Sequence, residues 1–506
     1  MLSVEQIAAR LDDRFHLLTS GSRTSIPRQQ TLQAAIDWSY NLLPELERRL
    51  FERLSVFSGG WSYEAAEAIS QIDVTFDLLE LLINKSLVIV DPATSEFRYY
   101  YLETLRQYAY EKLVESGQLE IFRQRHFYYF LAFIETAEAI LRGPDMLLWL
   151  DRLESEHDNF RSALEWAVDS HSIESLRMAA ALCYFWDRRG FVTEGLNWIK
   201  VALEHAKMSL DLKERSKPAY LAVMAKALAA EAVLAYDHGD TQDAQVAAEL
   251  SISLARQVGD ERTLAWSLSV GAKAIYLLGD VTLARAWAKE ALNLSRQQEY
   301  PFELGLALSA LQMSADPEYL VELNALCTET LPILHKRGNP WVLALNTFDA
   351  ASVADMSGNF IEAQARFDEA ARLFHSMGDR QYYTACRSML AHSLRRQARY
   401  SEALAIYRQT IQLWVDLGHL SAVAHELECI GFIAVDQGEN QRAGVLFGAA
   451  QGIRLQINSP MSSQERNEYE QVLARLRLQA DPADFNKSWS EGKLLTIEQA
   501  IEFTLL

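Results

Sequence analysis

Cysteine is scarce in this 506-residue chain, which contains only Cys183, Cys327, Cys386 and Cys429. The four are scattered and none belongs to a CxxC pair. Free cysteines are usually buried and behave as small apolar side chains. We therefore expect four reduced core residues in a protein of the cytoplasm.

Long apolar runs are also missing. The longest unbroken run is MAAALCYFW, residues 178–186, which is far shorter than the ~20 residues of a membrane-spanning helix. The first residues, MLSVEQIAARLDDRF, carry acids where a signal peptide needs a basic end and an apolar core. The sequence therefore predicts neither a membrane span nor a signal peptide.

Positive charge is in deficit. The formal net charge is −20, and residues 1–125 contain 13 Lys and Arg against 18 Asp and Glu. This balance opposes nonspecific attraction to nucleic acid or anionic lipid. A helix expected over residues 75–85 carries Asp77 and Glu80 against Lys85, with Asn84 alone suited to a base edge. The charges argue against direct DNA binding.

Signatures of catalysis are absent from the sequence. It contains no GxxxxGK[ST], GxGxxG or HExxH. The eleven histidines show no ligand spacing, and His419 and His425, six apart, are interpreted as helix-surface residues. Arg23 and Arg28 flank a Ser/Thr-rich loop, where they are either phosphate ligands or solvated side chains. We expect a non-enzymatic protein without a metal or a cofactor.

The N-terminal part combines helical and strand patterns. Apolar residues recur at helical spacing over residues 32–43 and 46–57, and Ser62 is placed to cap a following short helix. Residues 87–101 then alternate as two strands around a turn at Asp91-Pro92, with Phe97, Tyr99 and Tyr101 on one face. Helices followed by a hairpin predict a winged-helix domain over residues 28–125.

The rest of the chain repeats. Breaks mostly 20 residues apart, usually followed by Asp or Asn, predict a left-handed glycine at each helix end and a cap on the next helix. They are Gly239, Gly259, Gly279, Gly338, Gly358, Gly378, Gly418 and Gly438, with Ala398 holding one slot. Two helices form a unit of about 40 residues, which predicts a tetratricopeptide-like α-solenoid over residues 173–457. A helical connector, residues 126–172, would precede it and a helical cap, residues 458–506, would follow it.

A second regularity sets the register of these units. The residue five positions after every second break is alanine, and a small side chain there would let the partner helix approach closely. These residues are Ala244, Ala284, Ala363, Ala403 and Ala443. Gly195, five positions after Gly190, marks an earlier and diverged copy. The sequence thus predicts a mainly α-helical protein.

Several segments carry a family resemblance. The segments PRQQTL, DWSY, LESEHDNFRSALEWA and FGAAQGIRLQINSP resemble, in this order, the part that follows the nucleotide-binding core in bacterial STAND signal-transduction ATPases. These include the multidomain regulators of the LuxR and AfsR types. The resemblance implies a winged helix and a repeat sensor, with residues 1–27 as a remnant of the region that joins them to the NTPase core.

The resemblance also implies what is missing. Such proteins carry a P-loop core and an effector domain, and this sequence contains no P-loop. Their winged helices often present Met-His-Asp, whose histidine touches the nucleotide. The corresponding residues here are Tyr101, Leu102 and Glu103, followed by Thr104 and Arg106. We interpret them as a remnant of nucleotide sensing, because leucine cannot make the polar contact of histidine.

Two functions follow from these features. The first is a regulatory sensor whose solenoid binds a protein, a peptide or a small effector on its concave surface and relays this state through the winged helix. The second is a transcriptional regulator that binds DNA through the winged helix. Residues 1–30 would dock a separate NTPase, with Phe15, Leu17, Leu18, Trp38 and Tyr40 as candidates for the docking face unless they are locally buried.

Overall fold

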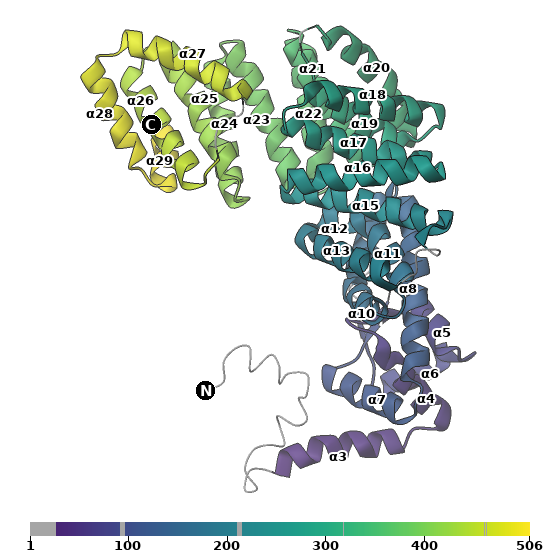
Figure 1. The fold of residues 1–506 in the computed structure, drawn as a ribbon. Helices are drawn as coiled ribbons and strands as arrows, with labels where there is room; N and C mark the ends of the chain where they lie inside the picture. Colours follow the sequence, from purple (N-terminus) through teal and green to yellow (C-terminus); the bar gives the residue numbers. More distant parts are fainter. Residues whose placement is uncertain are drawn as a thin grey trace. The chain divides into compact units, whose positions relative to one another are not determined.

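The computed structural model describes residues 27–91, 97–209, 215–316, 318–459, 461 and 463–505 (Figure 1). The chain forms two compact units. Unit 1 comprises residues 1–141 and 145–263, and unit 2 comprises residues 142–144 and 264–506. The predicted hinge remnant over residues 1–27 and the candidates Phe15, Leu17, Leu18 and Arg23 lie outside the described residues, except that Pro27 begins the first helix.

Unit 1 begins with a small α/β module. A three-stranded antiparallel sheet of order β1-β3-β2 pairs Tyr99 with Trp61 on one side and with Val90 on the other. Its elements are α3 (Pro27–Asn41), α4 (Glu45–Arg53), η1 (Leu54–Val56), β1 (Trp61–Ser62), α5 (Tyr63–Ser70), α6 (Thr75–Asn84), β2 (Ile89–Asp91), β3 (Arg98–Tyr100) and α7 (Glu103–Glu115). Helices followed by a hairpin match the predicted order, and the winged-helix assignment itself stays a prediction.

Local sequence explains most of these elements. The Ser62 hydroxyl accepts a hydrogen bond from the Ala65 N–H and caps α5. Leu50, Leu54 and Phe57 fill the core of the module, whereas Leu46 of the same predicted stripe is 48% exposed. The hairpin alternation also holds only in part. Tyr99 and Tyr101 are buried, but Phe97, which precedes β3, is exposed.

A bundle of helices completes unit 1. Its members are α8 (Leu119–Leu141), α9 (Met146–Ser155), α10 (His157–Ala167), α11 (Ser172–Ala181), α12 (Cys183–Arg189), α13 (Val192–Ser209), α15 (Pro218–His238) and α16 (Thr241–Val258). The predicted domain boundary at residue 125 falls inside α8, which runs unbroken from the module into the bundle. Phe122 and Phe130 lie on either side of that boundary and are both buried, and the domain division itself stays a prediction.

Helix α15 is the one helix among the described residues that is long and apolar enough to cross a membrane. An 18-residue window in it has a mean hydropathy of 1.5, and 56% of that window is buried inside the protein. The helix packs against α11, α13 and α16. Length and composition would suit a membrane span, but core helices of soluble proteins share both properties. Lys226 and Glu231 interrupt the run of apolar residues within this helix, so a search for unbroken apolar runs does not reveal it.

Unit 2 is a regular array of antiparallel helices with a C-terminal cap. The array comprises α17 (Glu261–Leu277, which starts in unit 1), α18 (Val281–Gln297), α19 (Pro301–Met313), α20 (Leu320–Arg337), α21 (Pro340–Met356), α22 (Phe360–Ser376), α23 (Arg380–Arg396), α24 (Tyr400–Asp416), α25 (Leu420–Asp436) and α26 (Asn440–Gln456). From α18 to α26 each helix packs against the next, and α19, α21, α23 and α25 also contact one another in succession. The predicted mainly α-helical repeat fold is confirmed.

Left-handed residues end most helices of the repeats. The predicted glycines have φ values between 72° and 100°, with one exception. Gly338 has φ −84° and ψ 161°. Asn339, which precedes Pro340, is also extended, because the proline ring disfavours the helical conformation of the residue before it. This two-residue extended link replaces the left-handed turn at Gly338.

The 20-residue spacing also continues through non-glycine residues. Glu299, Ala398 and Asn458 adopt φ values of 52°, 59° and 50°. Of the predicted acid and amide caps, Asp260, Asp280, Asn339 and Asp379 accept hydrogen bonds from the first turn of the next helix. Asp240 and Asn359 make no such bond.

The predicted small residues are all enclosed. Ala244, Ala284, Ala363, Ala403 and Ala443 are at most 1% exposed. At Gly195, an added Cβ would lie 2.6 Å from the Trp186 ring, so only glycine fits against that indole. Burial agrees with close helix contacts, and the alanine contacts themselves stay predictions.

Glycine also joins the array to its cap. The cap comprises α27 (Ser463–Gln479), α28 (Pro482–Lys493) and α29 (Ile497–Leu505). A Cβ on Gly448 of α26 would lie 2.2 Å from the Trp489 carbonyl oxygen, and one on Gly492 would lie 2.0 Å from the Val445 carbonyl oxygen. The backbones of α26 and α28 therefore touch, which explains the glycines of the FGAAQG segment.

Candidate functional site

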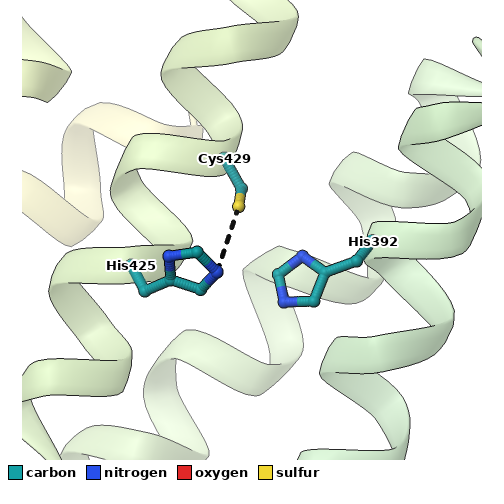
Figure 2. A group of neighbouring side chains, drawn as sticks. All are labelled: His392, His425 and Cys429. Atoms are coloured by element: carbon teal, nitrogen blue, oxygen red, sulfur yellow. Dashed lines mark hydrogen bonds between the residues drawn. The ribbon is translucent and has the colours of Figure 1, made fainter. Parts of the chain in front are cut away.

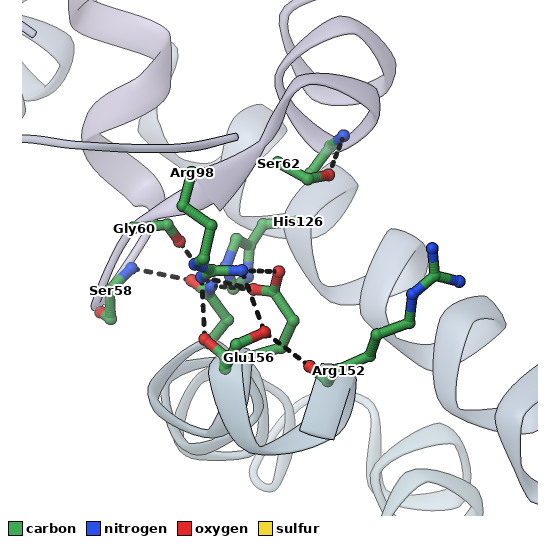
Figure 3. Close-up of polar contacts among 10 residues, drawn as sticks. Ser58, Gly60, Ser62, Arg98, His126, Arg152 and Glu156 are labelled. Carbon is green, nitrogen blue, oxygen red and sulfur yellow. Dashed lines mark hydrogen bonds and ion pairs between the residues drawn. The ribbon is translucent and has the colours of Figure 1, made fainter. Parts of the chain in front are cut away.

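A buried polar network joins the small module to the helical bundle within unit 1. We call Ser58, Gly60, Arg98, His126, Glu156 and Asn159 the junction network (Figure 3). Ser58 and Gly60 lie before β1, Arg98 is in β3, and His126 belongs to α8. Glu156 separates α9 from α10, and Asn159 lies in the first turn of α10. Three parts of unit 1 thus meet at one point.

An ion pair forms one half of the junction network. Arg98 Nη1 lies 2.5 Å from Glu156 Oε1, and Arg98 Nη2 donates to the Ser155 carbonyl oxygen at 2.8 Å. Both side chains are largely buried, with 15% and 8% exposed. Burial raises the pKa of Glu156, and Arg98 opposes this by stabilising the carboxylate. A buried pair of this kind depends on both partners, since either charge alone would be uncompensated.

The amide of Asn159 forms the other half. Its Oδ1 accepts a hydrogen bond from the Ser58 N–H at 2.8 Å and lies 3.2 Å from His126 Nε2. Its Nδ2 donates to the Gly60 carbonyl oxygen at 2.8 Å and to Glu156 at 2.6 Å. Asn159 is fully buried, and every polar atom of its amide has a partner. Burial lowers the pKa of His126 to about 4, so the imidazole is neutral at pH 7.

Two residues of the same segment, His157 and Arg161, contact α13 instead. Arg161 of α10 forms a two-point contact with Glu194 of α13, at 2.7 Å and 2.5 Å. His157 Nε2 lies 3.2 Å from the same carboxylate. Arg161 lowers the pKa of Glu194, while burial lowers the pKa of His157. The EHDNFR segment, residues 156–161, therefore connects the module on one side with α13 on the other.

The family resemblance marks this segment in the sequence but assigns no roles to its residues. It did not identify Arg98 and His126, which are distant in the chain and show no local pattern. A signal did exist for the segment itself: a dense run of polar residues precedes the apolar positions Phe160, Ala163 and Leu164 of α10. Such a run at a helix start is more polar than packing alone requires.

The predicted nucleotide-sensing remnant lies at the start of α7. Tyr101 is buried and its hydroxyl donates to the Phe51 carbonyl oxygen at 2.9 Å. Leu102 is 53% exposed, and Thr104 is half-buried. Arg106 pairs with Glu103 one turn away, at 2.8 Å. The Arg106 guanidinium is thus occupied by the Glu103 carboxylate. The interpretation of these residues as a remnant of nucleotide sensing stays a prediction.

The outer face of α6 is acidic and apolar. Its exposed residues are Phe76, Asp77, Glu80, Leu81 and Asn84. Lys85, which follows the helix, forms an ion pair with Glu47. A surface that reads DNA needs cationic and amide side chains directed outward. The exposed face of α6 offers one amide and two carboxylates.

Two of the docking candidates are described by the structure. Trp38 is 68% exposed on α3. Tyr40 is buried, and its hydroxyl donates to Glu52 at 2.5 Å. Of these two, only Trp38 is available to a partner.

Unit 2 contains a cluster of potential metal ligands. His392 of α23 meets His425 and Cys429 of α25 (Figure 2). The expectation that His425 is a surface histidine holds only in part, because its side chain is 25% exposed but its Nε2 faces Cys429. Sequence analysis missed the group because His392 lies one helix pair away. The local signal was the spacing of four between His425 and Cys429, which places both on one helix face. All four cysteines are free and buried.

Comparison with known proteins gives partial matches. No protein-family model matches the chain. A Mycobacterium tuberculosis protein described as a candidate HTH-type transcriptional regulator is 37% identical over 310 residues, which are 58% of this chain and 33% of that protein. An uncharacterized Mycobacterium bovis protein is 36% identical over 131 residues, which are 25% of this chain and 33% of that protein.

One solved structure resembles almost the whole chain. It is a Signal Transduction ATPase with Numerous Domains (STAND) with a tetratricopeptide repeat sensor, from Pyrococcus horikoshii. Its TM-score is 0.57 at 15% identity, covering 99% of this chain and 71% of that one. This likeness shows the fold alone. The chain spans about a third of the length of the curated relatives that it matches, and it is similar in that part to proteins described as candidate HTH-type transcriptional regulators.

Proposed function

We propose that this chain is the non-catalytic sensor part of a transcriptional regulator. Its repeats bind a protein, a peptide or a small effector, and the small α/β module, as a winged helix, passes the bound state on. Similarity to mycobacterial proteins described as candidate HTH-type regulators supports the regulatory class. The repeat fold supports the sensor role, because solenoids offer extended surfaces to their ligands.

The junction network is the observation that carries this proposal. A relay needs a contact that couples the module to the helices and has a defined arrangement. Asn159 binds the backbone of Ser58 and Gly60 in the module, while Arg161 of the same helix binds Glu194 of α13. A displacement of α13 would be transmitted through α10 to the module.

Direct DNA binding through the winged helix is the second candidate. The descriptions of the mycobacterial relatives favour it, although they apply to proteins of which the aligned part is only 33%. The acidic and apolar face of α6 favours the first candidate instead. A gel-shift titration of the purified chain with DNA from upstream of its own gene separates the two, and we expect no shift at physiological salt.

The proposal includes an NTPase that acts in trans. Residues 1–30 would dock this NTPase, and the protein would act in the cytoplasm. Because the sequence contains no P-loop, the chain itself would neither bind nor hydrolyse ATP. We expect no heat of binding when Mg²⁺-ATP is titrated into the purified chain. Tight Mg²⁺-dependent binding would show that the chain has its own nucleotide site.

A charge exchange in the cell tests the regulatory proposal. Strains carry a deletion of the gene, Arg98→Glu, Glu156→Arg, or both substitutions together, and their transcripts are compared with those of the wild type. We expect each single substitution to reproduce the deletion and the double substitution to restore part of the wild-type pattern. Arg49→Glu, at an exposed ion pair with Glu45 on α4, is the matched control and should change nothing.

Two results would contradict the proposal. A deletion that leaves transcription unchanged would exclude regulation. A regulatory phenotype that is unaffected by breaking the junction pair, in a chain that remains folded and abundant, would exclude the relay.

A further inference from the structure

Three side chains of unit 2 converge from two neighbouring helices. One imidazole nitrogen of His392, one of His425 and the Cys429 sulfur all lie within 4.8 Å of one another. His425 Nε2 is 3.7 Å from Cys429 Sγ, and His392 points toward the pair from α23 (Figure 2). We call these three residues the His–Cys cluster.

The separations suit a single ion. Zn²⁺ binds imidazole nitrogen at about 2.0–2.1 Å and thiolate sulfur at about 2.3 Å in a tetrahedral arrangement, so neighbouring ligand atoms lie roughly 3.3–3.6 Å apart. Small rotations of the three side chains would bring their ligand atoms to these distances. Two nitrogens and one sulfur form a ligand set typical of zinc and copper.

The partners of the two histidines orient the rings. His392 Nδ1 lies 2.6 Å from the Tyr407 hydroxyl. His425 Nδ1 faces the carboxylates of Glu428 at 3.5 Å and Glu465 at 3.4 Å. Histidines that bind metals usually contact a carboxylate or another polar group through the second nitrogen, which fixes the ring and makes it a better ligand.

The surrounding charges tolerate a cation. Glu428 is held by Arg454 at 2.7 Å and 2.9 Å, and Arg395 pairs with Glu468 at 2.6 Å. Arg396, which also acts on His392, pairs with Asp355, so with Glu465 four carboxylates face three guanidinium groups. A Cys429 thiolate adds one more negative charge.

The cluster is enclosed but accessible. His392 is 9% exposed and Cys429 1%. The side chain of His425 is 25% exposed and gives an ion a route to the other two. Water is otherwise largely excluded, which strengthens binding of a cation by a thiolate.

We propose that His392, His425 and Cys429 bind one Zn²⁺ ion, with a fourth coordination position left for water or an external ligand. On binding, the Cys429 S–H bond breaks and His425 Nε2 gives up any proton that it carries, both protons pass to the solvent, and zinc forms bonds to the sulfur and to one nitrogen of each imidazole. The ion joins α23 to α25, which belong to successive repeats, and so stiffens the array. This site is independent of the proposed relay through the junction network.

Metal titration of the full chain tests the site. The purified protein is stripped with a chelator and titrated with Zn²⁺ in competition with a chromophoric chelator, and separately with Co²⁺. We expect one equivalent of Zn²⁺, a thiolate-to-cobalt charge-transfer band and the intense visible bands of tetrahedral Co²⁺. Cys429→Ser should abolish the charge-transfer band and weaken Zn²⁺ binding at least about 100-fold, while Tyr407→Phe should weaken it about tenfold.

Matched controls separate this site from adventitious binding. Cys386→Ser changes a buried cysteine of α23 that is not part of the cluster, and His419→Gln changes a histidine six residues before His425. Both variants should bind Zn²⁺ as the wild type does. Zn²⁺ should also raise the thermal midpoint of these two variants but not that of Cys429→Ser. If Cys429→Ser does not fold, His425→Gln replaces it, and the Co²⁺ spectrum of the wild type decides.

Three outcomes would overturn the proposal. The first is a wild-type spectrum without a thiolate-to-cobalt band. The second is full Zn²⁺ stoichiometry in a folded Cys429→Ser or His425→Gln variant. The third is an equal loss of binding in Cys386→Ser. Any of these would mean that the cluster is only a set of buried hydrogen-bonding residues.

Discussion

The junction network of unit 1 and the His–Cys cluster of unit 2 are both buried and polar, but they are satisfied differently. In the junction network Arg98 faces Glu156, and every polar atom of the Asn159 amide has a partner. In the His–Cys cluster His425 Nε2 lies 3.7 Å from the Cys429 thiol, which is a weak hydrogen-bonding group. The first arrangement is complete within the protein, and the second is suited to an added ion.

The difference teaches how a buried polar group reveals its role. A complete network favours one geometry and so suits a coupling contact between parts of a unit. A cluster of ligand atoms that bind one another weakly suits a ligand instead. The variants below test this contrast, because each should affect one unit and leave the other unchanged.

Glu156→Ala should have the largest effect. It leaves the Arg98 guanidinium buried without its carboxylate and removes one partner of Asn159, at a cost of about 3–5 kcal/mol. We expect faster hydrogen exchange in α4, β3 and α10, with little change in α21–α26. Urea unfolding measures the loss of stability. Hydrogen exchange with mass spectrometry shows which helices and strands exchange faster.

An apolar replacement of the whole pair is the control for this variant. Arg98→Met combined with Glu156→Leu removes both charges and should recover much of the lost stability, because no uncompensated charge remains. If the double variant is no more stable than Glu156→Ala, the loss comes from packing and not from the charge.

Acid should weaken unit 1 through His126. Its pKa is about 4 in the folded protein because of burial, against about 6.5 in an unfolded chain. Above pH 6.5 both states are neutral and nothing changes. Between pH 6.5 and 4 the unfolded state takes up a proton that the folded state refuses, so stability falls by about 3 kcal/mol as pH falls.

His126→Gln isolates this contribution. Glutamine cannot titrate, while Glu156, whose pKa is raised by burial, is present in both proteins. The difference in unfolding free energy between wild type and variant should therefore shrink from pH 7 to pH 4. A constant difference across this range would mean that His126 titrates normally and is not enclosed.

Sequence reasoning predicted the repeat array well because the array is local and periodic. Two helices and their turns recur every 40 residues, and the same spacing extends to Glu299 and Asn458, which were not singled out. Glutamate gives no signal for a left-handed residue, so only the spacing could have indicated that turn. At Gly338 the prediction of a left-handed turn was wrong. Pro340 favours an extended link there, although the glycine has the same spacing as the others.

The functional residues were less predictable. The EHDNFR segment is contiguous and could be noticed, but its partners Arg98 and His126 come from a strand and a helix that packing alone brings together. In the His–Cys cluster only the four-residue spacing of His425 and Cys429 is local, and helix α24 separates these two residues from His392 in the sequence. Contacts of this kind depend on how repeats stack and not on any short pattern.

Ala363→Trp should damage unit 2 and leave the junction network intact. Ala363 is fully buried on α22, which packs against α21 and α23, so an indole there would overpack the array. We expect a loss of about 1–3 kcal/mol or more. Because repeats are stabilised by their neighbours, hydrogen exchange should rise first in α21–α23 and later in distant helices. Unchanged thermal unfolding would show that Ala363 does not lie at a close contact.

The smallest effect is expected at a turn of unit 2, and it has the opposite sign. Ala398 is left-handed, with φ 59°, at a position where most other repeats have glycine. This conformation costs a non-glycine residue roughly 1–2 kcal/mol. Ala398→Gly removes that strain but adds freedom to the unfolded chain, so we expect a net gain of about 0.5–1 kcal/mol.

Gly418→Ala is the matched control, because a Cβ at Gly418 would meet no atom within 4 Å and its φ of 76° is the sole obstacle. It should lose a similar amount. Both shifts should be seen in thermal unfolding and in the hydrogen exchange of α23–α25, with unit 1 unaffected. If Ala398→Gly and Gly418→Ala shift stability in the same direction, backbone strain does not decide which residue occupies these turns.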